Sequence, residues 1–556
     1  MTQSQKPAEG DAQAQGSAIT PVPTSVPKTV PRTPGTLGQT LRNPAFRGLW
    51  ASSGLYFIGN AMQAMAASWL MVELTGSSFL AALVQTSVFL PMFLLSLPAG
   101  VLADTTDRRR LILRALAVQA CTVVILSLLV LAGVAGPGTL LFFTFIAGCC
   151  TALFSPAWNS TVADTVPRED IGQAITAMSI AWNSARALGP AMAGFVFAHF
   201  GAGWVFAIAV ATGLVMMQAI RTWPPKPHPK SRLPAERLWG GTLSGLRFAR
   251  HSEIVLAQLL RTMAYSGAGS ALWALLPVIG QRQLGLGAAG FGLLMGCLGT
   301  GAVTAGLLMG RVRARVGLER LVASCCLIFA GVMLVTALVH IHVLVYASLV
   351  LGGAAWMAVM STFNTATQTS APPWVRSRAS ALHTLSALGS FAIGSAFWGA
   401  VSGVADLPVT LCIAAACMAA GVLLAKPFPL RMGEEHEVTP GTPWEELFIE
   451  AEPNPDDGPV AVEVGYRIRD GATAPFLDAL NQLRATRKRD GATFWRIYRD
   501  LSDSSRYVER FIVTSWADYL HQRARATVAD QTLEAAVREF LAPGETVTMQ
   551  HYIAEG

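Results

Sequence analysis

The chain has 556 residues, of which 52% are hydrophobic and only 13% charged, and its formal net charge is +7. Soluble proteins carry roughly 25% charged residues, which excludes one large soluble domain as the main part of this chain. The composition is typical of a polytopic membrane protein, whose lipid-facing surface needs no charge. We interpret the positive charge as Lys and Arg in cytoplasmic loops and expect no nucleic-acid binding.

Apolar runs of about 20 residues, the length that crosses roughly 30 Å of hydrocarbon, occur twelve times. Six runs come before a polar segment and six after it. The runs are Leu49–Val72, Phe79–Leu102, Leu111–Val134, Thr139–Ala163, Ala174–His199, Trp204–Ile220, Ile254–Gly280, Phe291–Gly310, Leu321–His340, Val343–Asn364, Ala379–Val401 and Pro408–Ala425. Each is expected to be a helix, because lipid offers the backbone no other hydrogen-bond partner.

Basic residues gather in every second turn between these runs. The turn after the second run carries Arg108–Arg110, whereas the turns after odd-numbered runs hold little besides Glu73, Arg282 and Asp406. Basic turns mark the cytoplasmic side of a membrane protein. We therefore predict a multi-pass protein of the cell inner (plasma) membrane, in contact with the lipid bilayer, with both termini in the cytoplasm.

The two halves of the membrane part resemble each other. The segment Gly100–Leu111 matches Gly310–Leu321, and Arg186–Gly194 aligns with Phe391–Gly399. Both matches stand at corresponding places, which indicates a duplicated fold. The predicted organisation is as follows: a disordered tail over 1–38, a six-helix bundle over 39–222, a cytoplasmic linker over 223–252 and a second bundle over 253–425.

The C-terminal part is soluble in character. Residues 426–459 are rich in Pro, Glu, Gly and Asp and are expected to be a linker, and residues 460–556 predict a β-α-β-β-α-β order, a ferredoxin-like α+β domain. The predicted strands are Val460–Ile468, Ala492–Arg499, Tyr507–Ser515 and Thr546–Ile553, and the helices are Ala474–Arg489 and Trp516–Phe540. Its only histidines, His521 and His551, form no metal-ligand or catalytic pattern, so we expect an interaction module without a cofactor.

The turn over Gly100–Arg110 resembles the signature between helices 2 and 3 of the major facilitator superfamily. Thr105 stands where a basic residue is usual, and Asp107 stands where Gly is usual. The second-half copy has Ala314 in place of the acid. The resemblance implies twelve transmembrane helices in two six-helix bundles, an all-α membrane fold to which the small α+β domain is added.

Further blocks narrow this resemblance. Gly189-Pro190 followed by Gly194 looks like the superfamily's antiporter motif. Together with the opening blocks Leu49-Trp50 and Trp69–Ser77, it resembles the branch of transmembrane secretion effectors that includes enterobactin exporters. The tail from Val460 is similar to the small α+β barrel domains of antibiotic-biosynthesis monooxygenases and their non-enzymatic relatives. Those domains usually pair, which implies a homodimer through the C-terminal domain.

The charged turn supplies a candidate cytoplasmic gate motif, formed by Gly100, Asp104, Arg108, Arg109 and Arg110. The carboxylate of Asp104 can accept hydrogen bonds from a helix N-terminus and pair with a basic residue, and so hold one state of the protein. The arginines can pair with cytoplasmic acids or anionic headgroups. The alternative for the arginines is that they only set the topology.

The fifth run carries a candidate pivot. Gly189, Pro190 and Gly194 allow a helix to bend and to approach a partner closely. Ordinary helix packing is the alternative, and the two interpretations are compatible, because a tight pivot is also a packing contact.

Five polar residues are candidates for substrate binding or coupling. Arg186 is the foremost, because it lies near mid-membrane, where an arginine is costly and is usually functional or paired. The second candidate, Arg261, can also reach the cytoplasmic surface. Asn60, Gln63 and Asn183 are candidate polar groups of a cavity. A structural polar contact is the alternative for each.

The sequence thus predicts a secondary active transporter rather than an enzyme. We expect an exporter of a small organic molecule, such as a siderophore, antibiotic or drug, driven by proton entry. The alternatives are an importer of the same superfamily, or a membrane-tethered enzyme acting through the C-terminal domain. No carboxylate falls within the middle of a predicted span, which leaves Asp104, Glu73, Asp164 or a less usual group as the proton site.

Overall fold

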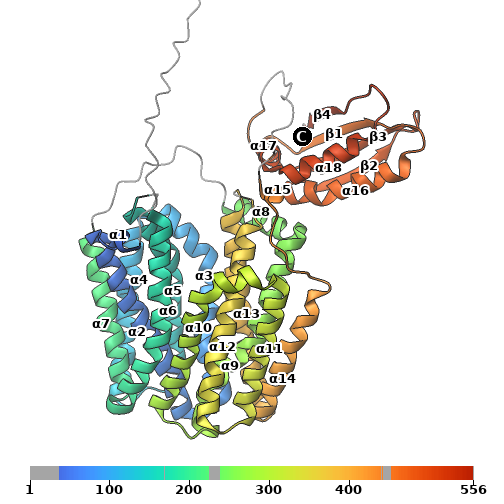
Figure 1. Cartoon of the computed structure of the whole chain (residues 1–556). Helices are drawn as coiled ribbons and strands as arrows, with labels where there is room; N and C mark the ends of the chain where they lie inside the picture. Colours follow the sequence, from blue (N-terminus) through green and yellow to red (C-terminus); the bar gives the residue numbers. More distant parts are fainter. Residues whose placement is uncertain are drawn as a thin grey trace, which may run out of the picture.

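The computed structural model of this chain describes residues 37–167, 170–223, 238–372, 374–439, 441 and 453–554. A helical bundle is followed by a small α+β domain, which lies beside one end of the bundle (Figure 1). The predicted disordered tail over 1–38 lies almost entirely outside the described residues, as do residues 224–237 of the predicted linker.

The first half of the bundle follows the predicted runs within a few residues. After the short α1 (Leu37–Thr40), its helices are α2 (Pro44–Thr75), α3 (Ser78–Thr105), α4 (Arg108–Leu131), α5 (Pro137–Thr165), α6 (Ile171–Phe200) and α7 (Ala202–Thr222). Local signals set the helix ends. The Asn43 side chain accepts hydrogen bonds from the first turn of α2, and Gly76 ends this helix with φ of 62°.

The second half repeats this layout after a short helix, α8 (Leu238–His251). Its long helices are α9 (Glu253–Val278), α10 (Ala288–Arg315), α11 (Leu318–Leu338), α12 (His342–Thr369), α13 (Arg376–Val404) and α14 (Leu407–Ala420). Short turns of other helix types, η2 (Ile279–Gln283) and η3 (Gly421–Ala425), extend α9 and α14. The linker then contains α15 (Glu435–Val438).

Eleven of the described helices are long and apolar enough to cross a membrane, which confirms a polytopic helical protein. The one remaining long helix of the bundle, α6, is not among the eleven, because Asn183 and Arg186 lower its hydropathy. Its 30 residues nevertheless run beside the helices of both halves. Trp50 of α2 donates a hydrogen bond to the Ala177 carbonyl at 2.8 Å, and Gly194 lies against Ala288 of α10.

The two halves of the bundle contact each other through α6 with α10 and through α3 with α13. A Cβ added at Gly399 would lie 2.5 Å from Cβ of Ala82, and one added at Gly194 would lie 2.6 Å from the Ala288 carbonyl oxygen. Ser402 donates to the hydroxyl of Ser78 at 2.8 Å. We call this end of the bundle, where α2 turns into α3, the closed end.

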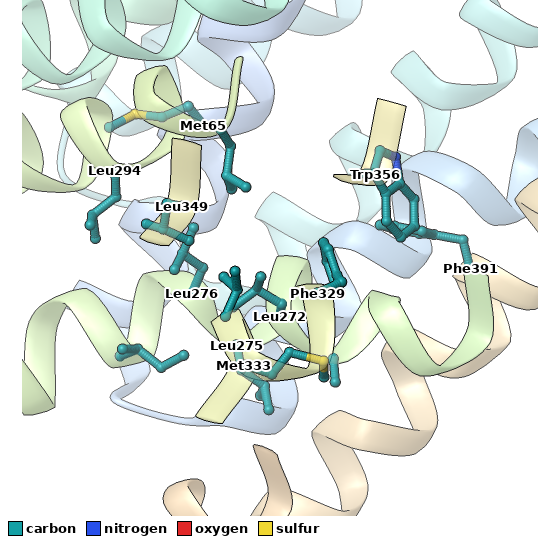
Figure 2. Close-up of a cluster of buried hydrophobic side chains, with 14 of the residues drawn as sticks. Met65, Leu272, Leu275, Leu276, Leu294, Phe329, Met333, Leu349, Trp356 and Phe391 are labelled. Atoms are coloured by element: carbon teal, nitrogen blue, oxygen red, sulfur yellow. The ribbon is translucent and has the colours of Figure 1, made fainter. Parts of the chain in front are cut away.

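An apolar cluster shared by both halves fills the bundle toward the closed end. Figure 2 shows Met65 of α2 together with Leu276 of α9, Leu294 of α10 and Leu349 of α12, all of them buried. The ring of Trp69 in α2 stacks on Phe291 in α10, with 5.2 Å between the centroids. Burial of this many apolar side chains from both halves stabilises their contact.

At the opposite end, which carries the basic turns, no hydrogen bond joins described residues of the two halves, because such bonds lie toward the closed end, at Ser78, Thr86 and Arg282. A Cβ added at Gly100 in α3 or at Gly310 in α10 would meet no atom within 4 Å. Leu307, one turn from Gly310 on α10, is 75% exposed. We call this the open end. The bundle is therefore joined at one end and parted at the other.

The small domain contains the four predicted strands in one antiparallel sheet of order β2-β3-β1-β4. Alternate residues of its first strand are buried against the helices. Its elements are β1 (Val460–Arg467), α16 (Thr473–Asp490), β2 (Phe494–Arg499), β3 (Arg506–Val513), α17 (Trp516–Arg525), α18 (Val528–Arg538) and β4 (Thr548–Ile553).

The single helix predicted over Trp516–Phe540 is wrong, because two helices stand there. Thr527 accepts a hydrogen bond from the Asp530 amide, and the Asp530 carboxylate accepts one from the Thr527 amide, so the pair forms a capping box that starts α18. The linker occupies the break, since the amide of Gly441 donates to the Ala526 carbonyl.

A buried carboxylate organises the core of the small domain. Glu509 is fully buried and accepts hydrogen bonds from Tyr466 at 2.9 Å, from Arg487 at 3.1 Å and from Trp495 at 2.8 Å. Such a charge is tolerated only with partners of this kind.

A second carboxylate of the small domain, Asp490, is also buried. Burial raises the pKa of the Asp490 carboxyl to about 6, against the effect of its neighbouring arginines.

The small domain contacts the second half of the bundle at the open end. Arg247 of α8 donates to the Gly491 carbonyl at 3.1 Å. The guanidinium of Arg525 lies over the ring of Trp374, 4.4 Å from its centroid, and this ring packs on Phe248 of α8. Figure 1 shows the small domain next to α8. Two arginine contacts therefore join the domain to elements of the second half.

Candidate functional site

Arg186 lies where the contact between the halves ends. Its guanidinium carbon is 5.4 Å from the centroid of Trp273 in α9, so a first-half cation lies over a second-half aromatic ring. Both side chains are half-buried. Among the described residues we find no hydrogen bond or ion pair from this guanidinium.

A glycine of α10 makes this position possible. A Cβ at Gly299 would lie 2.3 Å from Cα of Ala187 and 2.7 Å from the carbonyl oxygen of Arg186. Only a residue without a side chain permits backbones to come so close. The contact sets Arg186 at the boundary between the joined and the parted regions of the bundle.

An aromatic cluster begins at Trp273 and reaches both halves. Trp273 contacts Trp356 at 5.9 Å between centroids, Trp356 contacts Tyr265 at 5.3 Å and Phe391 at 6.0 Å, and Phe391 meets Phe89 of α3 at 4.7 Å. Figure 2 shows Trp356 beside Phe391. Sequence reasoning missed this cluster, because its members come from four helices and share no local spacing.

Two polar atoms of the cluster are buried without a hydrogen-bond partner in the described part of the chain. They are Nε1 of Trp273 and the hydroxyl of Tyr265. Buried donors normally have partners, and Nε1 of Trp158, Trp374 and Trp516 are likewise without one among the described residues. The aromatic cluster thus offers ring faces together with unsatisfied donors.

The hydrogen bonds of the amide candidates Asn60 and Asn183 lie within the first half. Asn60 accepts a hydrogen bond from Gln119 at 2.9 Å, and Gln119 in turn accepts one from Tyr56 at 2.6 Å. Asn183, one turn before Arg186, donates to the carbonyl of its own helix at Ser179. Gln63 is buried in α2. The structure therefore shows Asn60 in a network within the first half and Asn183 in a local contact.

Arg261 is held by an ion pair. Its guanidinium contacts both carboxylate oxygens of Glu319 at 2.5 and 2.7 Å, and the arginine is only 3% exposed. The same carboxylate accepts a hydrogen bond from the amide of Leu430. These contacts link α9, α11 and the segment after η3, which favours the structural alternative for Arg261.

The gate turn joins α3 to α4. The side chain of Asp104 lies outside the described part of the structure, so its predicted role stays a prediction. Asp107 caps α4 by accepting a hydrogen bond from the amide of Arg110 at 3.1 Å. Arg109 donates to the carbonyl of Arg221 in α7, and Arg108 to that of Ala103. Sequence reasoning missed the cap, although an Asp just before a helix is a known signal for one.

The second-half copy of this turn contains a different anchor. Arg313, one residue before Ala314, donates hydrogen bonds to the hydroxyls of Ser361, Thr362 and Thr365 in α12 at 2.9 to 3.2 Å. The copy therefore fixes α10 to α12 within its own half.

The three pivot candidates face different partners. A Cβ at Gly189 would lie 2.6 Å from that of Ala61, so Gly189 packs within the first half. Gly194 and the carbonyl of Pro190 instead face Gly292 of α10, across the boundary between the halves. The pivot role itself stays a prediction.

Comparisons with known proteins now give the family. The model of the family described as "Transmembrane secretion effector" matches residues 37–556. The chain is 28% identical over 236 residues to the uncharacterised MFS-type transporter YfiS of Bacillus subtilis, covering 40% of this chain and 54% of YfiS. It is 28% identical over 225 residues to the multidrug efflux pump Tap of Mycobacterium tuberculosis, covering 38% and 52%.

A third relative, the staphyloferrin A transporter of Staphylococcus aureus, is 26% identical over 158 residues, with 28% of this chain and 40% of that protein covered. The chain thus spans about half the length, or less, of the curated relatives it matches.

Solved structures show the same fold. The nucleoside transporter NupG has a TM-score of 0.57 at 12% identity, covering 70% of this chain and 100% of that one. A bacterial homologue of the iron transporter ferroportin, in an inward-facing state, has a TM-score of 0.54 at 14% identity, covering 70% of this chain and 99% of that one.

The enterobactin-exporter branch and the monooxygenase-like tail stay predictions. Because its family model matches almost all of the described chain, the protein belongs to the transmembrane secretion effectors of the MFS transporters.

Proposed function

We propose that this transporter is an exporter that carries a small organic molecule out of the cytoplasm across the inner (plasma) membrane by alternating access, in exchange for protons. The observation that carries the proposal is the shape of the bundle. The halves meet through close glycine contacts at the closed end, such as Gly194 with Gly292, and part at the end with the basic turns. If the basic turns face the cytoplasm, the state is inward-facing.

Rocking of the two halves then moves the site from one side to the other. Rigid helices pack through small residues at α6 with α10 and at α3 with α13, so the halves can slide or tilt with little change inside each half. Arg186 and Trp273 lie at the boundary between the halves, in contact with each other.

Export rather than import is supported by the family description and by a relative named as an efflux pump. The proton site is proposed among the few acids available. Glu73 lies near the closed end and accepts a hydrogen bond from Trp69 at 2.6 Å. The side chains of Asp104 and Asp164 lie outside the described part.

Transport direction is tested with everted membrane vesicles from cells that express the protein, energised to acidify the lumen. We expect at least one compound of a panel, made up of the cations ethidium and Hoechst 33342 and the organic anion fluorescein, to accumulate inside, and a protonophore to abolish this accumulation. Vesicles without the protein are the control. Uptake of these compounds by right-side-out vesicles only would instead establish an importer.

The gate motif is tested by Asp104→Asn, which keeps the side-chain shape but removes the charge. If Asp104 holds one state through hydrogen bonds and ion pairing, transport in the same vesicles falls by about tenfold or more. Asp107→Asn is the matched control, since Asn also caps helices well, and Ala314→Ser tests the second-half copy. Equal rates for Asp104→Asn and both controls would contradict the gate.

The C-terminal domain is proposed to be an interaction module rather than an enzyme, in line with a family and relatives that are transporters. Its exposed sheet face carries Tyr498, Arg510 and Tyr552. Pairing of two copies through this face stays a prediction.

A further inference from the structure

We infer that the site at Arg186 selects an organic anion that carries an aromatic ring, bound with its charge on Arg186 and its ring on the aromatic cluster. The inference rests on the proposed function only in taking this site as the transport site, and it names the substrate class that the proposed function leaves open.

The Arg186 guanidinium has no counter-ion among the described residues. A guanidinium at mid-bundle depth is costly unless it is paired or reached by water. In the described part of the chain, Glu319 is already paired with Arg261, and Glu73 lies toward the closed end beside Trp69. Among the described residues, the Arg186 guanidinium contacts only the ring of Trp273. An entering anion would supply the missing charge.

The guanidinium also limits the shape of that anion. Its planar fork of N–H donors matches a carboxylate, phosphate or sulfonate with two parallel hydrogen bonds. The indole N–H of Trp273 is a buried donor without a partner among the described residues, next to the same guanidinium. Donors from opposite halves therefore lie on neighbouring side chains, and both favour an acceptor-rich group.

Aromatic rings next to Arg186 favour a ring in the rest of the ligand. The half-buried rings of Trp273 and Phe89 stand at the two ends of the aromatic wall, and the rings of Trp356, Tyr265 and Phe391 between them are buried in contact with one another. Aromatic faces bind planar rings in stacked or edge-to-face geometry and give more than their buried area alone. A sugar-like ligand would need many polar partners, which this wall does not provide. A cation would be repelled by Arg186.

The placement of the two groups also links binding to the motion of the halves. Arg186 belongs to the first half, and Trp273 to the second. A ligand that holds both is bound fully only while the halves keep these two side chains near each other. Binding energy can then favour one arrangement of the halves over the other.

The test measures equilibrium binding to the full-length protein in lipid nanodiscs without any gradient. The probes are 2-naphthoate, its neutral isostere 2-naphthamide, and octanoate, which has the charge without the ring. Wild-type protein is expected to bind 2-naphthoate at least about tenfold more tightly than either of the other two.

Two variants separate the two parts of the site. Arg186→Gln is expected to remove the preference for 2-naphthoate over 2-naphthamide, whereas Trp273→Leu is expected to remove the preference for 2-naphthoate over octanoate. Arg186→Lys keeps the charge without the fork and should retain part of the charge preference. Trp204→Leu is the matched control, because Trp204 is 55% exposed on α7.

Equal binding of the acid and the amide by the wild-type protein would overturn the inference, as would an unchanged preference in Arg186→Gln. If Arg186→Gln does not fold, as judged by gel filtration, Arg186→Lys and the three wild-type affinities still decide. Failure of the vesicle assay with retained charge preference would instead reject export while leaving the inference in place.

Discussion

Gly299→Leu is expected to abolish transport while the protein still folds into its two halves. The added Cβ would fall 2.3 Å from Cα of Ala187 and 2.7 Å from the Arg186 carbonyl oxygen. These are backbone atoms, so α6 and α10 must move apart, and the closed end can no longer form as observed. We expect the vesicle transport rate to fall by at least about tenfold.

The matched control is Gly331→Leu in α11, another helical glycine, where an added Cβ meets no atom within 4 Å. This variant should transport at nearly the wild-type rate. Folding is followed by thermal unfolding and gel filtration in detergent. Wild-type transport by a well-folded Gly299→Leu would show that the close approach of α6 and α10 is not required in the cycle.

Glu319→Leu is expected to lower the thermal stability of the protein strongly. The change leaves Arg261, which is only 3% exposed, without its ion-pair partner. Loss of one member of a buried pair costs about 3–5 kcal/mol, and the partial exposure of Glu319 points to the lower end of that range. The change is measured as the midpoint of thermal unfolding in detergent.

The double variant Arg261→Met with Glu319→Leu decides what Arg261 does. Replacement of both charges by apolar side chains is often close to neutral, so the double variant should regain most of the lost stability. If Arg261 is structural, transport returns as well. Restored stability with no transport would show that Arg261 binds substrate or couples ions.

The membrane part was predictable where local signals decide the structure. Each transmembrane helix is an apolar run ended by polar, Gly or Pro residues, and such a run is visible without any partner. The strands of the small domain were visible for the same reason. The helix break at Thr527 was missed although the capping box is local, because the surrounding residues favour a helix on both sides.

The contacts of the site were not predictable, because they depend on helices far apart in sequence. Arg186 could be singled out as a cation at mid-depth, but its neighbour Trp273 is 87 positions later in the chain and shares no motif with it. Arg261 looked similar to Arg186 in the sequence. Only the position of α11 beside α9 reveals Glu319 as its partner.

The small domain is attached to the second half of the bundle and therefore offers a position from which that half can be observed. Arg247 and Trp374 tie it to the second half, outside the apolar bundle. A water-exposed body thus follows helices that are themselves surrounded by lipid. Leu501, 96% exposed at a turn of this domain, is a natural position for a spectroscopic label. A label at this position is expected to report a tilt of the second half from the water phase, outside the lipid-embedded helices.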